Sequence, residues 1–325
     1  MRTFEEVAKI VMAAKSTSEL FGKDPAKTYK KLMLLCHPDK NGNSILAVQV
    51  SARLNELYAQ LKTTIKIGKW TVQSPIGKGD ICDVHKVYES GGEPKLAESY
   101  GVLKVARSAD DSDLLDREKE TIEHLHKEAK THNYVRYVPS FLDSFSIGDC
   151  KANVLSLARE CYTLKQLKEL VKPSIEPRHL IWMMNRLLSL LGYAHRCGIV
   201  HGAITPDHLM YRPSDHGLVV VGWCSSIQDK KKQCVPYISK EWQDLYAPEI
   251  FRKCACPGTD IYMAMQSMNW AGMLPSRFDG IRQLCLAGSP QSRPEDAWKV
   301  QEQWKALAEE EFGPPSFTPL VLPVN

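Results

Sequence analysis

The segment from Val200 to Met210 constrains the fold of this chain more than any other part of its sequence. It follows a long amphipathic pattern over residues 178–197, whose spacing predicts a helix. The apolar run over residues 217–224 comes after it and predicts a strand. Between them, polar side chains alternate with the apolar residues Ile204 and Leu209. The sequence therefore predicts a polar loop supported by a buried helix and a buried strand.

The order of residues in this loop resembles the catalytic loop of the protein kinase-like fold, His-Arg-Asp-Leu-Lys-Pro-x-Asn-Leu. His201 and Pro206 stand at the same positions as in that family. In the family, the Asp accepts the proton of the substrate hydroxyl and the Asn binds a metal ion. Ala203 and His208 occupy those two positions here. The resemblance thus implies a kinase scaffold without its catalytic groups.

The strand after the loop ends in a segment that resembles the second metal-binding motif of kinases, Asp-Phe-Gly or Asp-Trp-Gly. Alignment on Trp223 puts Gly222 at the Asp position, whereas alignment on Gly222 puts Val220 there. Neither alignment supplies an acidic residue. Metal ions neutralise the charge that develops in phosphoryl transfer. We therefore expect no metal site, no magnesium cofactor and negligible ordinary kinase activity.

Residues 76–87 resemble the glycine-rich hairpin of the kinase small lobe. Gly77, Gly79 and Val84 are in register with that motif, and Cys82 replaces its third glycine. Glycines at such a turn allow backbone N–H groups to approach phosphates. The resemblance implies a nucleotide site for which ATP is the candidate ligand, and the substitution by Cys82 weakens this pattern without removing it.

A single lysine, Lys104, interrupts the apolar run over residues 100–106, as in the third strand of kinases. A charged group inside an apolar strand needs a partner. Glu118, in the helical pattern over residues 114–125, best matches the glutamate that kinases use. The pair has two interpretations that the sequence leaves open: it orients a nucleotide phosphate, or it is only a structural ion pair.

Further matches lie at structural positions of the kinase large lobe. Glu249 follows Ala247-Pro248, as at the end of the activation segment. Asp260 matches the residue that braces the backbone of the catalytic loop, and Arg293 matches the partner of Glu249 in a buried ion pair. Structural positions are retained where catalytic ones are lost, which favours a folded pseudokinase over a chance match.

Residues 1–62 show a separate helical pattern. Thr3 and Glu6 form a capping box before one amphipathic helix, and Asp24-Pro25 predicts the start of a second helix. A third helical pattern begins near Ser44. Between the second and third patterns, the residues from His37 to Gly42 force the chain out of the helix.

This N-terminal segment resembles the J-domain of DnaJ-type co-chaperones. In that family, a His-Pro-Asp loop and a basic helix dock on a DnaK-type heat-shock chaperone and stimulate its ATP hydrolysis. The resemblance assigns the stimulating contact to His37, Pro38 and Asp39, and the contact with an acidic surface to Lys27, Lys30 and Lys31. The alternative interpretation is a helix-ending turn beside a solvated lysine face.

The expected fold class is therefore multidomain, with a small all-α helical-hairpin J-domain followed by a bilobal α+β protein kinase-like fold. The expected boundaries are 1–62 for the J-domain, 63–68 for a short linker, 69–160 and 161–312 for the two kinase-like lobes, and 313–325 for a proline-rich tail. We expect the tail to lie as an extended strap on a lobe.

The formal net charge of +4 is concentrated in residues 1–62, which hold 10 Lys and Arg against 6 Asp and Glu. This distribution favours an acidic protein partner at the N-terminal segment and is too weak to predict nucleic-acid binding. No apolar run approaches the ~18 residues of a membrane span. The first residues lack the pattern of a signal peptide, and the 10 cysteines show no repeated spacing. We expect a cytoplasmic protein with reduced thiols.

The favoured function is a co-chaperone whose pseudokinase module is a scaffold for a client, for another protein or for a nucleotide. The alternative is an atypical ATP-dependent phosphotransferase that uses Asp207, four residues after Ala203, together with His208. A third hypothesis is a scaffold whose N-terminal module has lost its activity. The sequence favours a protein that is not an enzyme.

Overall fold

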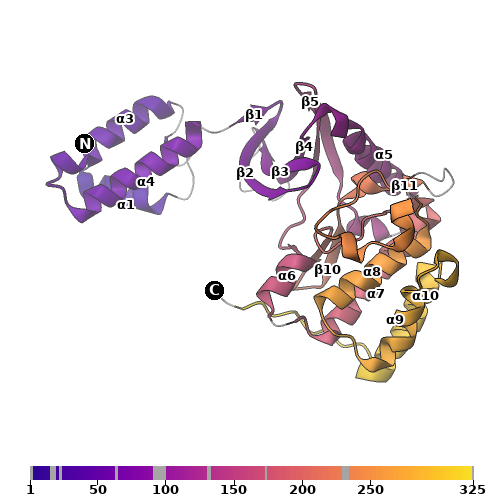
Figure 1. The fold of residues 1–325 in the computed structure, drawn as a ribbon. Coiled ribbons are helices and arrows are strands. Elements are labelled where there is room, and N and C mark those ends of the chain that lie inside the picture. The colour runs from indigo at the N-terminus through magenta and orange to yellow at the C-terminus, as the bar shows by residue number, and fades with distance from the viewer. Residues whose placement is uncertain are drawn as a thin grey trace. The chain divides into compact units, whose positions relative to one another are not determined.

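The computed structural model describes residues 3–14, 20–21, 24–62, 65–90, 100–129, 133–172, 174–228, 234–252 and 254–323 (Figure 1). Residues 63–64 of the expected linker and 324–325 of the expected tail lie outside these ranges. Contacts within the chain separate it into two compact units. The first comprises residues 1–73 with 87–93, and the second comprises residues 74–86 with 94–325.

The helical part of the first unit contains α1 (Phe4–Ala13), α3 (Pro25–Cys36) and α4 (Ile45–Lys62). A one-turn 3₁₀ helix, η1 (Pro38–Lys40), lies between α3 and α4. Each pair of the three α-helices is in contact. The three helical patterns predicted from the sequence are therefore confirmed, and the chain leaves α3 at His37 as predicted.

The starts of the first two helices follow from their capping residues. The backbone N–H of Thr3 donates to the Glu6 carboxylate at 3.0 Å, and the N–H of Glu6 donates to Thr3 Oγ1 at 3.4 Å. Asp24 accepts the N–H of Lys27 at 3.1 Å, and Pro25 occupies the first turn of α3. These bonds use backbone donors that a helix start leaves unsatisfied.

Apolar side chains from all three helices form the core of this part of the first unit. The ring of Tyr29 stacks on that of Tyr58 with centroids 3.9 Å apart, and the Tyr29 hydroxyl donates to Asn55 Oδ1 at 2.6 Å. The buried core residues are Val7, Ala8, Val11, Ala14, Phe21, Cys36, Val50, Leu54 and Leu57. The lysines of α3 are exposed and lie outside this core.

A six-stranded sheet follows the helices along the chain. Its order is β1 (Lys66–Ile67), β2 (Trp70–Lys78), β3 (Cys82–Glu89), β4 (Tyr100–Ala106), β6 (Cys150–Ser156) and β5 (Phe141–Ile147). Strand β1 lies within the segment expected as a linker, so that segment is partly strand. Helix α5 (Ser112–Glu128) packs on β6, where the buried Asn153 side chain donates to the carbonyl of Leu115 at 2.7 Å.

The part of the second unit that follows the sheet along the chain is mainly helical. Its α-helices are α6 (Leu164–Leu170), α7 (Pro177–Arg196), α8 (Pro257–Ala271), α9 (Asp279–Cys285) and α10 (Ala297–Phe312). Its short strands are β7 (Tyr162–Thr163), β8 (Ile199–Val200), β9 (Leu209–Arg212), β10 (Gly217–Val220) and β11 (Ile227–Gln228). The 3₁₀ turns are η3 (Ala109–Asp111), η4 (Asn133–Tyr137), η5 (Trp223–Ser225), η7 (Gln243–Leu245), η8 (Pro248–Arg252), η9 (Ser276–Phe278) and η10 (Pro290–Ser292).

Helix α7 is the central element of this helical part, and it confirms the helix predicted over residues 178–197. It packs against α8 and α10 (Figure 1). Most of its apolar side chains are buried. Trp304 of α10 is fully buried and donates its indole N–H to the carbonyl of Ile181 at 2.9 Å. This core gives the loop after α7 a rigid support.

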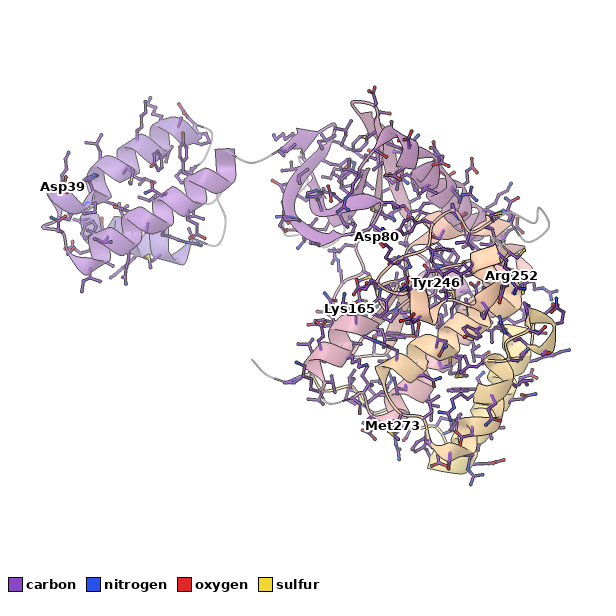
Figure 2. The ribbon with its side chains drawn as sticks, in the orientation of Figure 1. Asp39, Asp80, Lys165, Tyr246, Arg252 and Met273 are labelled. Carbon is purple, nitrogen blue, oxygen red and sulfur yellow. The ribbon has the colours of Figure 1, made fainter. Side chains whose placement is uncertain are left out.

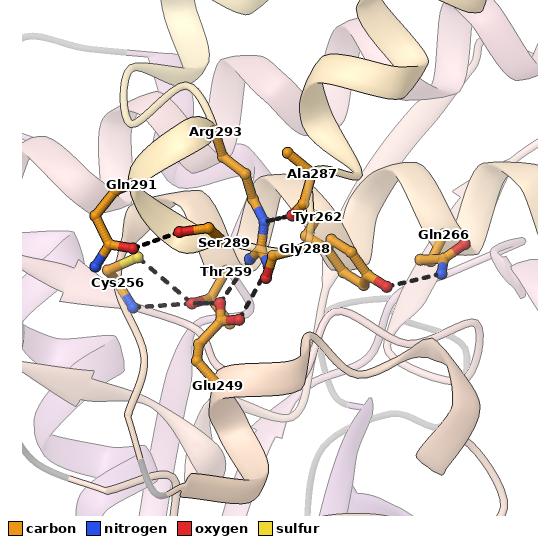
Figure 3. Close-up of polar contacts among 10 residues, drawn as sticks. All are labelled: Glu249, Cys256, Thr259, Tyr262, Gln266, Ala287, Gly288, Ser289, Gln291 and Arg293. Carbon is orange, nitrogen blue, oxygen red and sulfur yellow. Dashed lines mark hydrogen bonds and ion pairs between the residues drawn. The ribbon is translucent and has the colours of Figure 1, made fainter.

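A buried ion pair ties η8 to the segment before α10 (Figure 3). Arg293 donates to the two carboxylate oxygens of Glu249 at 2.6 and 3.0 Å. The Thr259 hydroxyl donates to the same carboxylate at 2.7 Å, and Arg293 also donates to the carbonyls of Ala287 and Gly288. The pairing of Glu249 with Arg293 predicted from the sequence is confirmed.

The residues after α10 form no regular structure in the part of the tail that the structure describes. Leu320 is buried, and its backbone N–H donates to the carbonyl of Pro213 at 3.2 Å. The ring of Phe317 lies 5.0 Å from that of His216. The described part of the tail therefore lies as a strap on the helical part, as predicted.

Among the described residues, no helix combines the length and the apolar character needed to cross a membrane.

Candidate functional site

A cavity of about 510 Å³ lies within the second unit. Its lining comes from the β2–β3 hairpin, β4, the end of β6, α6, the loop before β9, the segment after β10 and the residues before η8. Figure 2 labels one lining residue from each of three elements: Asp80 of the hairpin, Lys165 of α6 and Tyr246 before η8. The cavity brings together the following predicted site residues: Gly77, Gly79, Val84, Lys104, Asp207, His208 and Gly222.

The inner walls of the cavity are apolar. Val84 and Val102 project from neighbouring strands of the sheet, and Leu155 and Met210 complete the slot. Leu157 and Ala158, in the segment that follows β6, also line it. A slot with apolar faces and a few polar groups at its edges is the usual form of a small-molecule site.

Lys104 of β4 and Glu118 of α5 form an ion pair at the back of the cavity. Both residues are buried, Glu118 completely. Burial alone would lower the pKa of Lys104, but the Glu118 carboxylate outweighs it and raises the pKa above its ordinary value. The geometric part of the prediction is confirmed, since the lysine in the apolar strand has the expected partner.

Hydrogen bonds from α5 hold this ion pair in place. The Thr121 hydroxyl and the Ser226 hydroxyl are 2.7 Å apart and both are buried. Arg117 donates to the carbonyl of Ser226 at 3.2 Å. The face of α5 that carries Glu118 is thus bonded to the segment that follows η5.

The loop before β9 is braced as the sequence predicts. The Asp260 carboxylate of α8 accepts the backbone N–H groups of His201 and Gly202, each at 2.8 Å, and contacts His195 Nε2 at 2.9 Å. His201 is fully buried and its Nε2–H donates to the carbonyl of Val221 at 3.0 Å. Burial lowers the pKa of His201 to about 4, so its ring is neutral at pH 7.

His208 and Gly222 share one volume at the floor of the cavity. The Nδ1 atom of His208 lies 2.7 Å from the carbonyl oxygen of Ala203, and a carbonyl only accepts, so Nδ1 carries the hydrogen. Burial lowers the pKa of His208, which keeps the ring neutral. Gly222 has a φ of +85°, and a Cβ at this residue would lie 2.6 Å from the His208 ring. The His208 ring therefore fills the space that a side chain at residue 222 would need.

The β2–β3 hairpin is present as predicted, but its turn is internally bonded. The backbone N–H of Gly79 donates to the carbonyl of Cys82 at 2.9 Å. Cys82 is buried in a small cluster with Ile81, Leu114 and Cys224. Burial raises the pKa of the Cys82 thiol and raises that of Cys224 to about 11, so neither is a thiolate at pH 7. The glycine turn thus packs on the segment after β10.

Asp207, the proposed substitute for the missing acid, has partners of its own. The indole N–H of Trp242 donates to its carboxylate at 2.7 Å, and Lys165 Nζ lies 3.9 Å away. Lys165 also forms an ion pair with Glu241. Sequence analysis did not single out Trp242, Lys165 or Glu241, and no local pattern marks them.

With this geometry the chain can be compared with known proteins. No family model matches its sequence, and no curated protein matches it. Solved structures do match. The kinase domain of Mycobacterium tuberculosis PknI, as a double mutant, aligns with a TM-score of 0.59 at 15% identity, over 76% of this chain and 98% of that domain. The second unit has a protein kinase-like fold.

Two further crystal structures of the same kinase domain agree. In one of them the PknI domain aligns with a TM-score of 0.55 at 13% identity, covering 75% of this chain and 98% of that domain. A single mutant aligns with a TM-score of 0.56 at 14% identity, covering 76% of this chain and 98% of that domain. At this level of identity the likeness concerns the fold alone.

In the first unit, the predicted partner-binding residues lie along α3 and in the turn that follows it. Lys27, Lys30 and Lys31 are exposed on this helix, spaced as one face. The side chains of His37 and Asp39 are 47% and 78% exposed, and the N–H of Asp39 donates to His37 Nδ1 at 3.2 Å. Leu34 and Leu35, which the sequence analysis did not single out, are exposed on the same helix.

Proposed function

We propose that this protein is a J-domain co-chaperone whose kinase-like module does not perform ordinary phosphoryl transfer. The N-terminal module would recruit a DnaK-type chaperone in the cytoplasm and stimulate its ATPase, and the kinase-like module would hold a client protein, a further partner or a nucleotide. The chaperone part of the proposal rests on the exposed His37-Pro38-Asp39 turn. This turn directly follows α3, the helix with the exposed lysines.

Several features of the first unit support this proposal. The turn joins two helices that pack on each other, so its geometry is fixed by a core rather than by its own residues. Asn41 donates from its side chain to the carbonyls of Leu35 and His37 at 2.9 and 3.0 Å, which satisfies acceptors at the end of α3. The His37 and Asp39 side chains remain exposed. A preformed, exposed turn loses little conformational entropy on binding.

The cavity floor supports the second part of the proposal. A kinase needs a carboxylate at the place of Ala203 and metal ligands at the places of His208 and Gly222. Here Ala203 offers no proton acceptor in its side chain, and the neutral His208 ring occupies the volume beside Gly222. Loss of a catalytic base costs about 10²–10⁴-fold in rate, and loss of metal-mediated neutralisation adds to it.

Substitution of His37 by glutamine tests the chaperone part. We expect His37→Gln to reduce stimulation of a DnaK-type ATPase by about tenfold or more, as for a central contact residue in an interface. Steady-state ATP hydrolysis by the chaperone, with the full-length protein added, measures this. Lys9→Gln, a change at an exposed lysine of α1, is the matched control and should keep full stimulation. Undiminished stimulation by a folded His37→Gln variant would contradict the stimulating role of His37. No stimulation by the unchanged protein would favour the third hypothesis, a scaffold with an inactive N-terminal module.

An atypical phosphotransferase remains the second candidate function because Asp207 lines the cavity next to His208. The carboxylate of Asp207 already accepts the Trp242 indole N–H. This hydrogen bond makes Asp207 a weaker proton acceptor for catalysis. Transfer of the ATP γ-phosphate to protein substrates, assayed with magnesium and with manganese, separates the two functions. We expect no transfer above background. Transfer that Asp207→Ala abolishes would establish the enzyme instead.

A further inference from the structure

The charges that line the kinase-like cavity are unusual for a phosphate site. The lysine and carboxylate side chains in its lining are Lys104, Lys165, Asp80, Glu169, Asp207 and Glu241. Two lysines against four carboxylates leave a net charge of −2. Each lysine is also engaged, Lys104 with Glu118 behind the wall and Lys165 with Glu241. Each lysine charge is thus balanced by a carboxylate, and the described lining holds no excess positive charge for a phosphate.

One backbone donor of the glycine turn is also in use. Gly79 donates its N–H to Cys82 within the hairpin, and burial of Cys82 and Ile81 against Cys224 packs the space under the turn. Tyr237 packs against this cluster and faces Asp80 at the tip of the hairpin. A triphosphate placed beside the turn would meet the Asp80 carboxylate and would find the Gly79 N–H already bonded.

The inner slot, in contrast, has unsatisfied polar groups between its apolar walls. Thr205 is 1% exposed and lines the cavity, and its Oγ1 has no hydrogen-bond partner in the described part of the chain. The backbone groups of Leu157 and Ala158 likewise have no backbone partner among the described residues. A buried hydroxyl without a partner is costly. These groups fit the polar edges of a flat molecule held between Val84 and Met210.

We propose that this cavity binds an uncharged planar heterocycle of nucleoside size and discriminates against ligands that carry phosphates. The proposal rests on the impaired kinase-like module described above and narrows its ligand from a nucleotide to a nucleoside-like molecule. The apolar slot supplies affinity, Thr205 and the backbone after β6 supply orientation, and the lining carboxylates repel phosphate.

Isothermal titration of the full-length protein with adenosine, ADP and ATP, each with and without magnesium, tests the proposal. We expect adenosine to bind, each added phosphate to weaken binding, and ATP to bind at least about tenfold more weakly than adenosine. Magnesium should not restore ATP binding. ATP binding as tight as that of adenosine would overturn the proposal, and so would the absence of binding by all three compounds.

A variant without two of the lining carboxylates tests whether their charge weakens ATP binding. Asp80→Asn combined with Glu169→Gln should strengthen ATP binding by about tenfold or more, because two repulsive charges are removed. Adenosine binding should change by less than about twofold. The matched control is Glu120→Gln with Glu123→Gln, two exposed carboxylates of α5 outside the lining. Equal gains from the two double variants would contradict the role of the lining charges. None of these changes touches His37, so the outcome is separable from the chaperone assay.

Discussion

Replacement of Arg293 by methionine should lower the free energy of unfolding of the kinase-like unit by about 3–5 kcal/mol. The Arg293 side chain is fully buried and the Glu249 side chain is 9% exposed, so the substitution leaves a carboxylate buried without its counter-charge. The substitution also releases the carbonyls of Ala287 and Gly288, which accept from the same guanidinium. Thr259 alone would remain to donate to Glu249. Chemical denaturation followed by tryptophan fluorescence measures the loss.

The size of this effect depends on burial, which a surface pair can test. Arg282 and Asp279 form an ion pair at 2.7 Å with side chains 36% and 44% exposed. Arg282→Met should therefore cost less than about 1 kcal/mol. The double variant Glu249→Gln with Arg293→Met should be more stable than Arg293→Met alone, because the buried charge is gone. A loss below about 1.5 kcal/mol in Arg293→Met would show that water or another cation compensates Glu249.

The resemblance to kinase motifs correctly predicted several buried polar contacts of the kinase-like unit. Lys104 with Glu118, Glu249 with Arg293, and Asp260 at the loop backbone all lie where the sequence predicts. All of these residues are charged and buried, and a buried charge requires a partner. Such residues stand out in a sequence because burial of an unpaired charge is too costly to occur by chance.

The hydrogen bonds of the residues that line the cavity could not be predicted from the sequence in the same way. The hydrogen bond from Trp242 to Asp207 joins residues 35 positions apart, and neither lies in a local pattern that marks the other. The internal bond of Gly79 depends on the exact turn of the hairpin, which Cys82 sets by burial. The resemblance to the glycine-rich hairpin of kinases predicted Gly77 and Gly79 as residues that approach a phosphate. Their actual hydrogen bonds required the folded turn.

Replacement of Gly222 by alanine should lower the free energy of unfolding by about 3 kcal/mol. The left-handed backbone of Gly222, with a φ of +85°, costs an alanine about 1–2 kcal/mol. The added Cβ would also lie 2.6 Å from the His208 ring, which its bond to the Ala203 carbonyl holds in place, and such overpacking costs about 1–3 kcal/mol. Thermal and urea unfolding of the full-length protein measure the sum.

A second glycine and a double-mutant cycle separate these two costs. Gly198 has a φ of +76°, and no atom lies within 4 Å of the place that a Cβ would take there, so Gly198→Ala should show only the backbone cost. In the His208→Ala background the steric cost of Gly222→Ala should vanish, which gives a coupling of about 1–2 kcal/mol between the two residues. Strictly additive losses would show that the ring and the glycine are independent. A measured coupling would mean that a side chain at residue 222 requires removal of the His208 ring.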